Sequence, residues 1–275
     1  YRNVRFQKSL FLNTATDNDY ADFKIDNLSQ SVTSIKMGSK QIDILEYFND
    51  NPPTVWFADG SSLEGNYYVQ LKQLIKPYPV DLLISWNWEG VNLKKEAQKV
   101  HPIQYDSIQY RVIQQLLKDE FDIVYDDDYS GEIADVITIK ETEYNINVQF
   151  YHLKYAKEGK ISSRIDNFYD VCGQAQKSIH WKHKKGSEFF EHLLRRERKV
   201  KNGNEKSRIE KGKKEDLERL LKLAKNKKPM NFEIFIVQPS LSPSNASESI
   251  LTLLGVTENY LKEVGDVDLK VIISE

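Results

Sequence analysis

The sequence contains very little cysteine and no long apolar run. Its 275 residues include a single cysteine, Cys172, which excludes an intramolecular disulfide framework and any zinc site built from several cysteines. No segment approaches the roughly 18 uninterrupted apolar residues that a membrane-spanning helix needs. Residues 1–8 are mixed and polar and do not form a signal-peptide pattern. We therefore expect a cytoplasmic protein with no membrane segment.

The chain is not poor in core-forming residues. Hydrophobic residues make up 40% of it and aromatic residues 11%, which is enough for a buried core and excludes wholesale disorder. The length suits one large domain or two ordinary ones. Because the chain begins at Tyr1 rather than at a methionine, we expect it to be part of a longer protein.

Charge is distributed very unevenly along the chain. The formal net charge is -2, yet the segment from Gln176 to Lys228 contains 19 Lys and Arg against 8 Asp and Glu. A polyanion responds to local potential rather than to the total charge. The segment therefore indicates either a phosphate-bearing partner or a solvated, highly charged helical hairpin.

Hydrophobic periodicity predicts an α/β fold with a mixed central sheet and flanking helices. Residues 1–98 read as a smaller, β-rich α+β region, and residues 99–275 as a second domain with a basic helical insertion at 182–228. In the second domain we expect a helix from Ser107, strands at 121–125, 133–140 and 146–155, and a helix at 165–181. Two basic helices (188–200, 207–225), a buried strand (232–238), a helix (246–264) and a final strand (269–273) follow.

The second and third of these strands contain the polar residues of greatest interest. Glu132 and Asp135 stand at the start of the second strand, and His152 and Lys154 lie two residues apart on the third. Because side chains alternate along a strand, His152 and Lys154 are expected on one face, where Asp135 can meet them if the strands pair. Such a group can hold a divalent cation and stabilise charge on a phosphate. The alternative is a structural Asp135–Lys154 ion pair beside a hydrogen-bonded core histidine.

These residues resemble a known family. Asp135 followed by His152-Leu153-Lys154, in a helix–three strands–helix–strand order, is similar to the PD-(D/E)XK phosphodiesterase superfamily, which has the restriction-endonuclease-like fold. The runs at 126–135, 151–155 and 169–178 also resemble nuclease-like domains at the C-termini of large bacterial helicase-type proteins of restriction and anti-phage defence. The resemblance covers about residues 90 to 275 and implies an αβββαβ core.

The resemblance implies a Mg²⁺- or Mn²⁺-dependent endodeoxyribonuclease with little sequence specificity. Asp135, Glu132 and His152 are the implied metal ligands, Lys154 acts on the attacking water or the transition-state charge, and Gln174 faces the site from the following helix. The family usually has an acidic residue where His152 stands. An inactive DNA-binding module that loads a helicase or partner protein therefore remains an open alternative.

The resemblance and the charge distribution together also suggest partners. We expect DNA, a helicase or ATPase domain of the same longer protein or of a partner subunit, and a possible second copy of the chain. On the preceding helix, where the family often has an acidic residue, Gln109 is the residue that can reach the site. The expected phosphate contacts are Lys177, Lys182, Lys184, Lys185, Arg195, Arg196 and Arg198.

Overall fold

The computed structural model describes residues 33–37, 40–51, 53–57, 61–64, 67–69, 76–99, 102–197 and 207–275. The chain divides into two compact units, Tyr1–Leu74 and Ile75–Glu275. The sequence placed the boundary near residue 98 instead. The difference arises because strand β6 (Leu83–Trp86) pairs in parallel with β12 (Leu269–Ser274), so that residues 76–98 belong to the second unit.

The described part of the first unit is β-rich, as expected. Strands β1 (Ser34–Met37) and β2 (Lys40–Asp43) form an antiparallel pair, and helix α1 (Ile44–Asp50) follows, with the Asp43 carboxylate accepting from the backbone N–H of Leu45. Strands β3 (Thr54–Trp56), β4 (Ser62–Glu64) and β5 (Tyr67–Val69) form an antiparallel sheet. Expected strands at 4–12 and 22–28 lie outside the described residues.

The second unit is built on a seven-stranded mixed sheet with the order β10-β7-β8-β9-β11-β12-β6. Strands from β10 to β9 are antiparallel neighbours, and those from β9 to β6 are parallel. This mixed α/β architecture confirms the fold class predicted from the sequence. The remaining strands are β7 (Ile123–Asp126), β8 (Val136–Glu141), β9 (Ile146–Leu153), β10 (Ile209–Lys211) and β11 (Met230–Val237).

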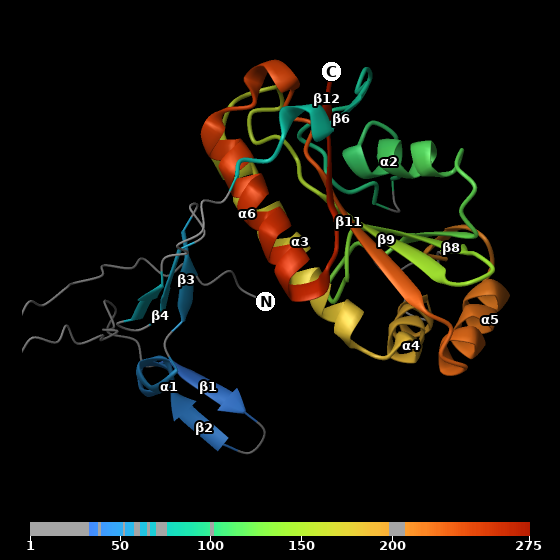
Figure 1. Ribbon diagram of the computed structural model, residues 1–275, viewed down its shortest axis with the longest axis horizontal. Coiled ribbons are helices and arrows are strands. Elements are labelled where there is room, and N and C mark those ends of the chain that lie inside the picture. Colours follow the sequence, from blue (N-terminus) through green and yellow to red (C-terminus); the bar gives the residue numbers. More distant parts are fainter. Residues whose placement is uncertain are drawn as a thin grey trace, which may run out of the picture. The chain divides into compact units, whose positions relative to one another are not determined.

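Helices cover both faces of this sheet (Figure 1). Helix α2 (Ile108–Leu116) begins where the Ser107 hydroxyl accepts from the N–H of Tyr110, and its apolar side packs on one face against residues such as Tyr151. The other face, which includes Phe150, is covered by four helices. These are α3 (Tyr169–Ser178), α4 (Gly186–Glu197), α5 (Lys214–Lys225) and α6 (Glu248–Gly265).

Two predicted helices are interrupted. The helix expected at 165–181 consists of a 3₁₀ turn (Ile165–Asn167), α3 and a second 3₁₀ segment, η3 (Ile179–His183). The helix expected at 207–225 is preceded by strand β10, because Gly212 turns the chain at the sheet edge. Gly212 has a φ of 90°, and a Cβ there would lie 2.4 Å from the Asp122 carbonyl oxygen, so only glycine permits this turn. Shorter 3₁₀ turns are Val80–Leu82 and Pro243–Asn245.

Candidate metal centre

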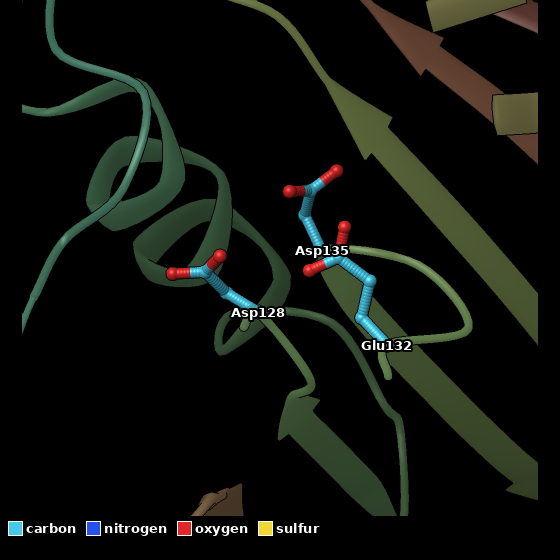
Figure 2. A group of neighbouring side chains, drawn as sticks. All are labelled: Asp128, Glu132 and Asp135. Carbon is cyan, nitrogen blue, oxygen red and sulfur yellow. The ribbon is translucent and has the colours of Figure 1, made fainter. Parts of the chain in front are cut away.

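Three carboxylates meet in the loop that connects β7 to β8. Ligand oxygens of Asp128, Glu132 and Asp135 all lie within 4.8 Å of one another, and the three side chains gather around one point in Figure 2. We call them the acidic cluster. Carboxylate oxygens are the ligands that Mg²⁺, Mn²⁺ and Ca²⁺ prefer. The structure thus brings together two of the predicted metal ligands, Glu132 and Asp135, and adds Asp128.

Asp135 is the most constrained member of the acidic cluster. Its side chain is buried, with 6% of the residue exposed, and one carboxylate oxygen accepts a 2.8 Å hydrogen bond from the N–H of Leu153 at the end of β9. Its own N–H donates to the Tyr151 carbonyl. Burial, and then the charge of Glu132, raise the pKa of Asp135 well above its usual range. A bound cation would favour the ionised carboxylate and so relieve this electrostatic cost.

Glu96 is a fourth carboxylate beside the acidic cluster, and no sequence pattern predicted it. Its carboxylate accepts a 2.9 Å hydrogen bond from the N–H of Tyr155 and lies 3.5 Å from the Lys154 ammonium group. Burial raises the pKa of Glu96, Lys154 lowers it, and the charge of Asp128 raises it further. Glu96 lies in an irregular segment ahead of α2, where no helical or strand period marks a site residue.

Lys154 lies between two carboxylates and is mostly buried. Its ammonium group is 3.5 Å from Glu96 and 3.9 Å from Asp170 in the first turn of α3, and its side chain is 16% exposed. These are its carboxylate partners within the described part of the chain. The ion pair that the sequence suggested as an alternative, between Asp135 and Lys154, is therefore replaced by one with Glu96.

His152 does not face the acidic cluster, which corrects its expected role as a metal ligand. Its Nε2 lies 3.0 Å from the Ser178 hydroxyl, which itself donates to the Ala175 carbonyl. Because that hydroxyl has one hydrogen, it accepts from a protonated Nε2. The side chain turns toward α3 because alternation along β9 places it on the same face as Phe150, and α3 covers that face. Lys154 follows the last residue of β9, so strand alternation no longer fixes its direction.

The buried histidine makes stability depend on pH. Burial lowers the pKa of His152 from 6.5 to about 3, so below pH 6.5 the unfolded chain binds a proton that the folded chain does not. Stability is therefore lost as pH falls. We expect His152→Gln to remove about 2 kcal/mol of the loss in unfolding free energy between pH 7 and pH 4.5. Urea unfolding at both pH values measures the change in unfolding free energy. The control variant His180→Gln, at an exposed position on η3, should lose as much stability between the two pH values as the wild type does. An equal loss in the His152 and His180 variants would refute the prediction.

Arg196 holds the loop that supports the acidic cluster. Its guanidinium group forms an ion pair with the buried Asp127 carboxylate and donates to the carbonyls of Ser130, at 2.9 Å, and Tyr129, at 3.1 Å. Asp127 also accepts a 2.7 Å hydrogen bond from the N–H of Ile133. Arg196 is only 2% exposed. This corrects the expectation that it contacts nucleic-acid phosphates, because a side chain enclosed by its own loop cannot reach them.

A second arginine and a glutamine complete the support of this loop. Arg208 donates to the carbonyls of Asp126, at 3.1 Å, and Asp128, at 2.9 Å. The Gln109 amide donates to the Asp126 carboxylate at 3.0 Å and to the Asp135 carbonyl at 3.2 Å. Gln109 therefore contacts the backbone of Asp135 rather than the ligand oxygens. It positions the acidic cluster and does not bind a cation.

The remaining predicted residues that the structure describes lie on the α3–α4 side of the sheet. Gln174 is on α3, and its side-chain oxygen is buried without a hydrogen-bond partner in the described part of the chain. Lys177 and Arg195 are exposed, and Arg198 lies outside the described residues. Lys182, Lys184 and Lys185 line a pocket at the start of α4. Burial raises the pKa of the Cys172 thiol to about 12, which makes it unreactive.

Comparison of the chain with protein-family models, with curated proteins and with solved structures finds no match. Among the helices that the structure describes, none has the length and apolar character required to cross a bilayer. The chemistry of the site therefore follows from its own geometry. The acidic cluster offers a hard, oxygen-rich position for a divalent cation, and Lys154 adds a positive charge that Glu96 holds in place.

Proposed function

We propose that the unit Ile75–Glu275 is a divalent-metal-dependent phosphodiesterase that cleaves DNA. The observation that carries this proposal is the acidic cluster, in which Asp135 is buried beside two further carboxylates and has a strongly raised pKa. The αβββαβ order of α2, β7–β9, α3 and β11 supports it, as does the resemblance of Asp135 and Lys154 to the PD-(D/E)XK pattern. From the same resemblance we propose that the chain belongs to a larger helicase-type defence protein.

In this proposal each side chain of the site has a separate role. Asp128, Glu132 and Asp135 would hold the cation, which supplies a polarised phosphate oxygen and a water of lowered pKa when it is bound. Lys154 stabilises negative charge that develops on the phosphate, because its ammonium group is partly removed from solvent. Glu96 positions Lys154 through their 3.5 Å contact. Arg196 and Arg208 position the loop between β7 and β8, which contains all three ligands.

One observation favours a second candidate, an inactive nuclease-fold module that binds DNA. His152 occupies the position where the family usually supplies an acidic ligand, and its side chain turns into the core beneath α3. The acidic cluster then lacks any ligand from β9 in the described structure. This module would bind DNA in a salt-sensitive manner and would not cut it with any cation.

A plasmid-cleavage assay separates the two candidates. With Mg²⁺ or Mn²⁺ the purified chain is expected to nick supercoiled DNA, and Lys154→Gln to slow cleavage by about 10²-fold or more, the scale of a lost transition-state contact. Lys157→Gln, three residues away and exposed, is the matched control and should cleave as the wild type does. Salt-sensitive binding without cleavage by the wild type would favour the inactive module, and equal cleavage by both variants would reject a role for Lys154.

A further inference from the structure

A pocket of about 530 Å³ lies between α4, α5 and the start of β11, and six lysines line it. They are Lys182, Lys184, Lys185, Lys225, Lys227 and Lys228, and the lining includes no aspartate or glutamate. We call this feature the lysine pocket. The six side chains come from both ends of the basic segment, which the fold brings together around one hollow. A concave site lined by one sign of charge focuses the electrostatic potential on a small volume.

Three of the six lysines already have partners. Lys182 donates to the Gly265 carbonyl at the end of α6. Lys225 pairs with Glu191 at 3.1 Å, and Lys228 pairs with Glu141 at 2.7 Å. These contacts connect the walls of the pocket to α6, α4 and β8, but among the residues that the structure describes only Lys225 and Lys228 are paired with a carboxylate.

The other three lysines lack a carboxylate partner within the described part of the chain. The Lys184 ammonium group lies 4.3 Å from the centroid of the Trp181 ring, and Lys185 and Lys227 are exposed. Lys227 has a φ of 62°, in the left-handed region that usually favours glycine or asparagine after a helix. Unlike glycine or asparagine, a lysine at this position adds a positive charge to the rim of the pocket.

The floor of the pocket differs chemically from its rim. Met230 and Phe232, at the start of β11, give it an apolar base, and Phe232 packs on Phe150 with ring centroids 5.5 Å apart. Gly186, the first residue of α4, packs tightly here, since a Cβ would lie 2.5 Å from the Met230 sulfur. The lysines of the lining give the rim a positive charge. The rim therefore suits anionic groups, and the floor suits a flat apolar or aromatic group.

The lysine pocket and the acidic cluster lie at opposite ends of the same strands. Strands β9 and β11 pair from Ile146–Met230 to Leu153–Val237. The pocket contains Met230, whereas Asp135 bonds to Leu153. The eight paired residues span seven steps of about 3.3 Å, which separates the two sites by about 23 Å. A ligand in the pocket is thus not held by the proposed metal centre, and the two sites can be tested independently.

We infer that the lysine pocket binds a ligand of nucleotide size that has two or more phosphate groups. Its volume lies within the range of roughly 300–1,000 Å³ of small-molecule sites. Lys184, Lys185 and Lys227 contact the phosphates, and Met230 and Phe232 contact the base or sugar. The ligand is either a free nucleotide or a nucleotide unit of a polynucleotide, because both present the same chemistry to the pocket. The inference does not rest on the proposed phosphodiesterase activity.

Calorimetric titrations of the full chain in EDTA, with inorganic tripolyphosphate, ATP and a short single-stranded oligodeoxynucleotide as probes, test this inference. At least one probe is expected to bind with one site per chain. Lys185→Gln with Lys227→Gln should weaken that binding about tenfold or more, because each lost lysine removes a charge-assisted hydrogen bond. The control pair Lys118→Gln with Lys160→Gln, at exposed positions away from the pocket, has the same change in net charge and should bind within about twofold of the wild type.

The probes distinguish the two sources of the ligand. Binding of tripolyphosphate or ATP that the pocket variant loses assigns the site to a free nucleotide. Binding of the oligodeoxynucleotide alone, with the same loss, assigns it to a polynucleotide. The inference is overturned if no probe binds, or if the pocket and control variants lose affinity equally. Because the titrations contain EDTA, the proposed metal centre holds no cation in any of them, so its failure is not mistaken for failure of the pocket.

Discussion

Asp135→Asn is expected to abolish metal-dependent DNA cleavage and, at the same time, to stabilise the metal-free protein. Loss of this ligand should weaken Mn²⁺ binding by about 10²-fold or more, since even outer-shell partners of a metal are worth about 10–100-fold. The unfolding free energy without metal should rise by about 1 kcal/mol or more near pH 7. The two effects have opposite signs because the same buried carboxylate binds the cation and repels its neighbours.

The sign of the stability change follows from the raised pKa of Asp135. In the folded chain the ionised carboxylate is disfavoured by burial and by Glu132, whereas in the unfolded chain it ionises freely in water. Near neutral pH the fold therefore bears either the cost of the charge or the cost of taking up a proton. Asparagine removes both costs, and its side-chain oxygen can still accept from the N–H of Leu153.

Two measurements check this prediction. Urea unfolding in EDTA compares the stability of the metal-free proteins, and calorimetric titration with Mn²⁺ compares their affinities. Asp119→Asn, an exposed carboxylate outside the acidic cluster, is the control and should change neither quantity appreciably. If Asp135→Asn instead lowered stability and bound Mn²⁺ as the wild type does, Asp135 would be a structural residue and the proposed metal centre would be rejected.

Structural features that depend on neighbouring residues, such as the positions of strands and helix starts, were predictable from the sequence. Alternation and apolar runs located β7, β8, β9 and β11 to within three residues at each end, and Ser107 marked the start of α2. Glu132 and Asp135 were expected to lie close together because both stand beside the start of a strand, where side chains are held by the sheet. The error at His152 arose from the same rule, since alternation gives the face of a strand and does not say which partner lies over it.

Contacts between distant segments were not predictable in this way. Glu96 reaches Lys154 across 58 positions of the chain from an irregular segment, and Arg196 reaches Asp127, in the loop after β7, from helix α4. Neither residue stands in a local pattern that marks its partner. Composition suggested that Arg196 binds phosphates, which is wrong because Arg196 is buried. A basic segment can contain both exposed residues that are free to bind phosphates and buried structural residues, and only the packing of the chain shows which are which.

Arg196→Ala is expected to cause the largest loss of stability, about 3–5 kcal/mol. It leaves the Asp127 carboxylate, which is 0% exposed, without its cationic partner and removes the donor to the carbonyls of Tyr129 and Ser130. Arg195→Ala removes the preceding arginine, which is exposed, and should change stability by no more than about 0.5 kcal/mol. Equal effects of the two substitutions in urea unfolding would show that Arg196 is not held as described.

The double variant with Asp127→Asn separates the two functions of Arg196. If the loss in Arg196→Ala comes from a buried uncompensated charge, adding Asp127→Asn removes that charge and should recover about half of the lost stability or more. Affinity for Mn²⁺ should remain low, because the carbonyls of Tyr129 and Ser130 still lack the donor that fixes the loop beside Asp128. Recovery of both quantities together would mean that the loop keeps its conformation without Arg196, and that the acidic cluster does not depend on it for position.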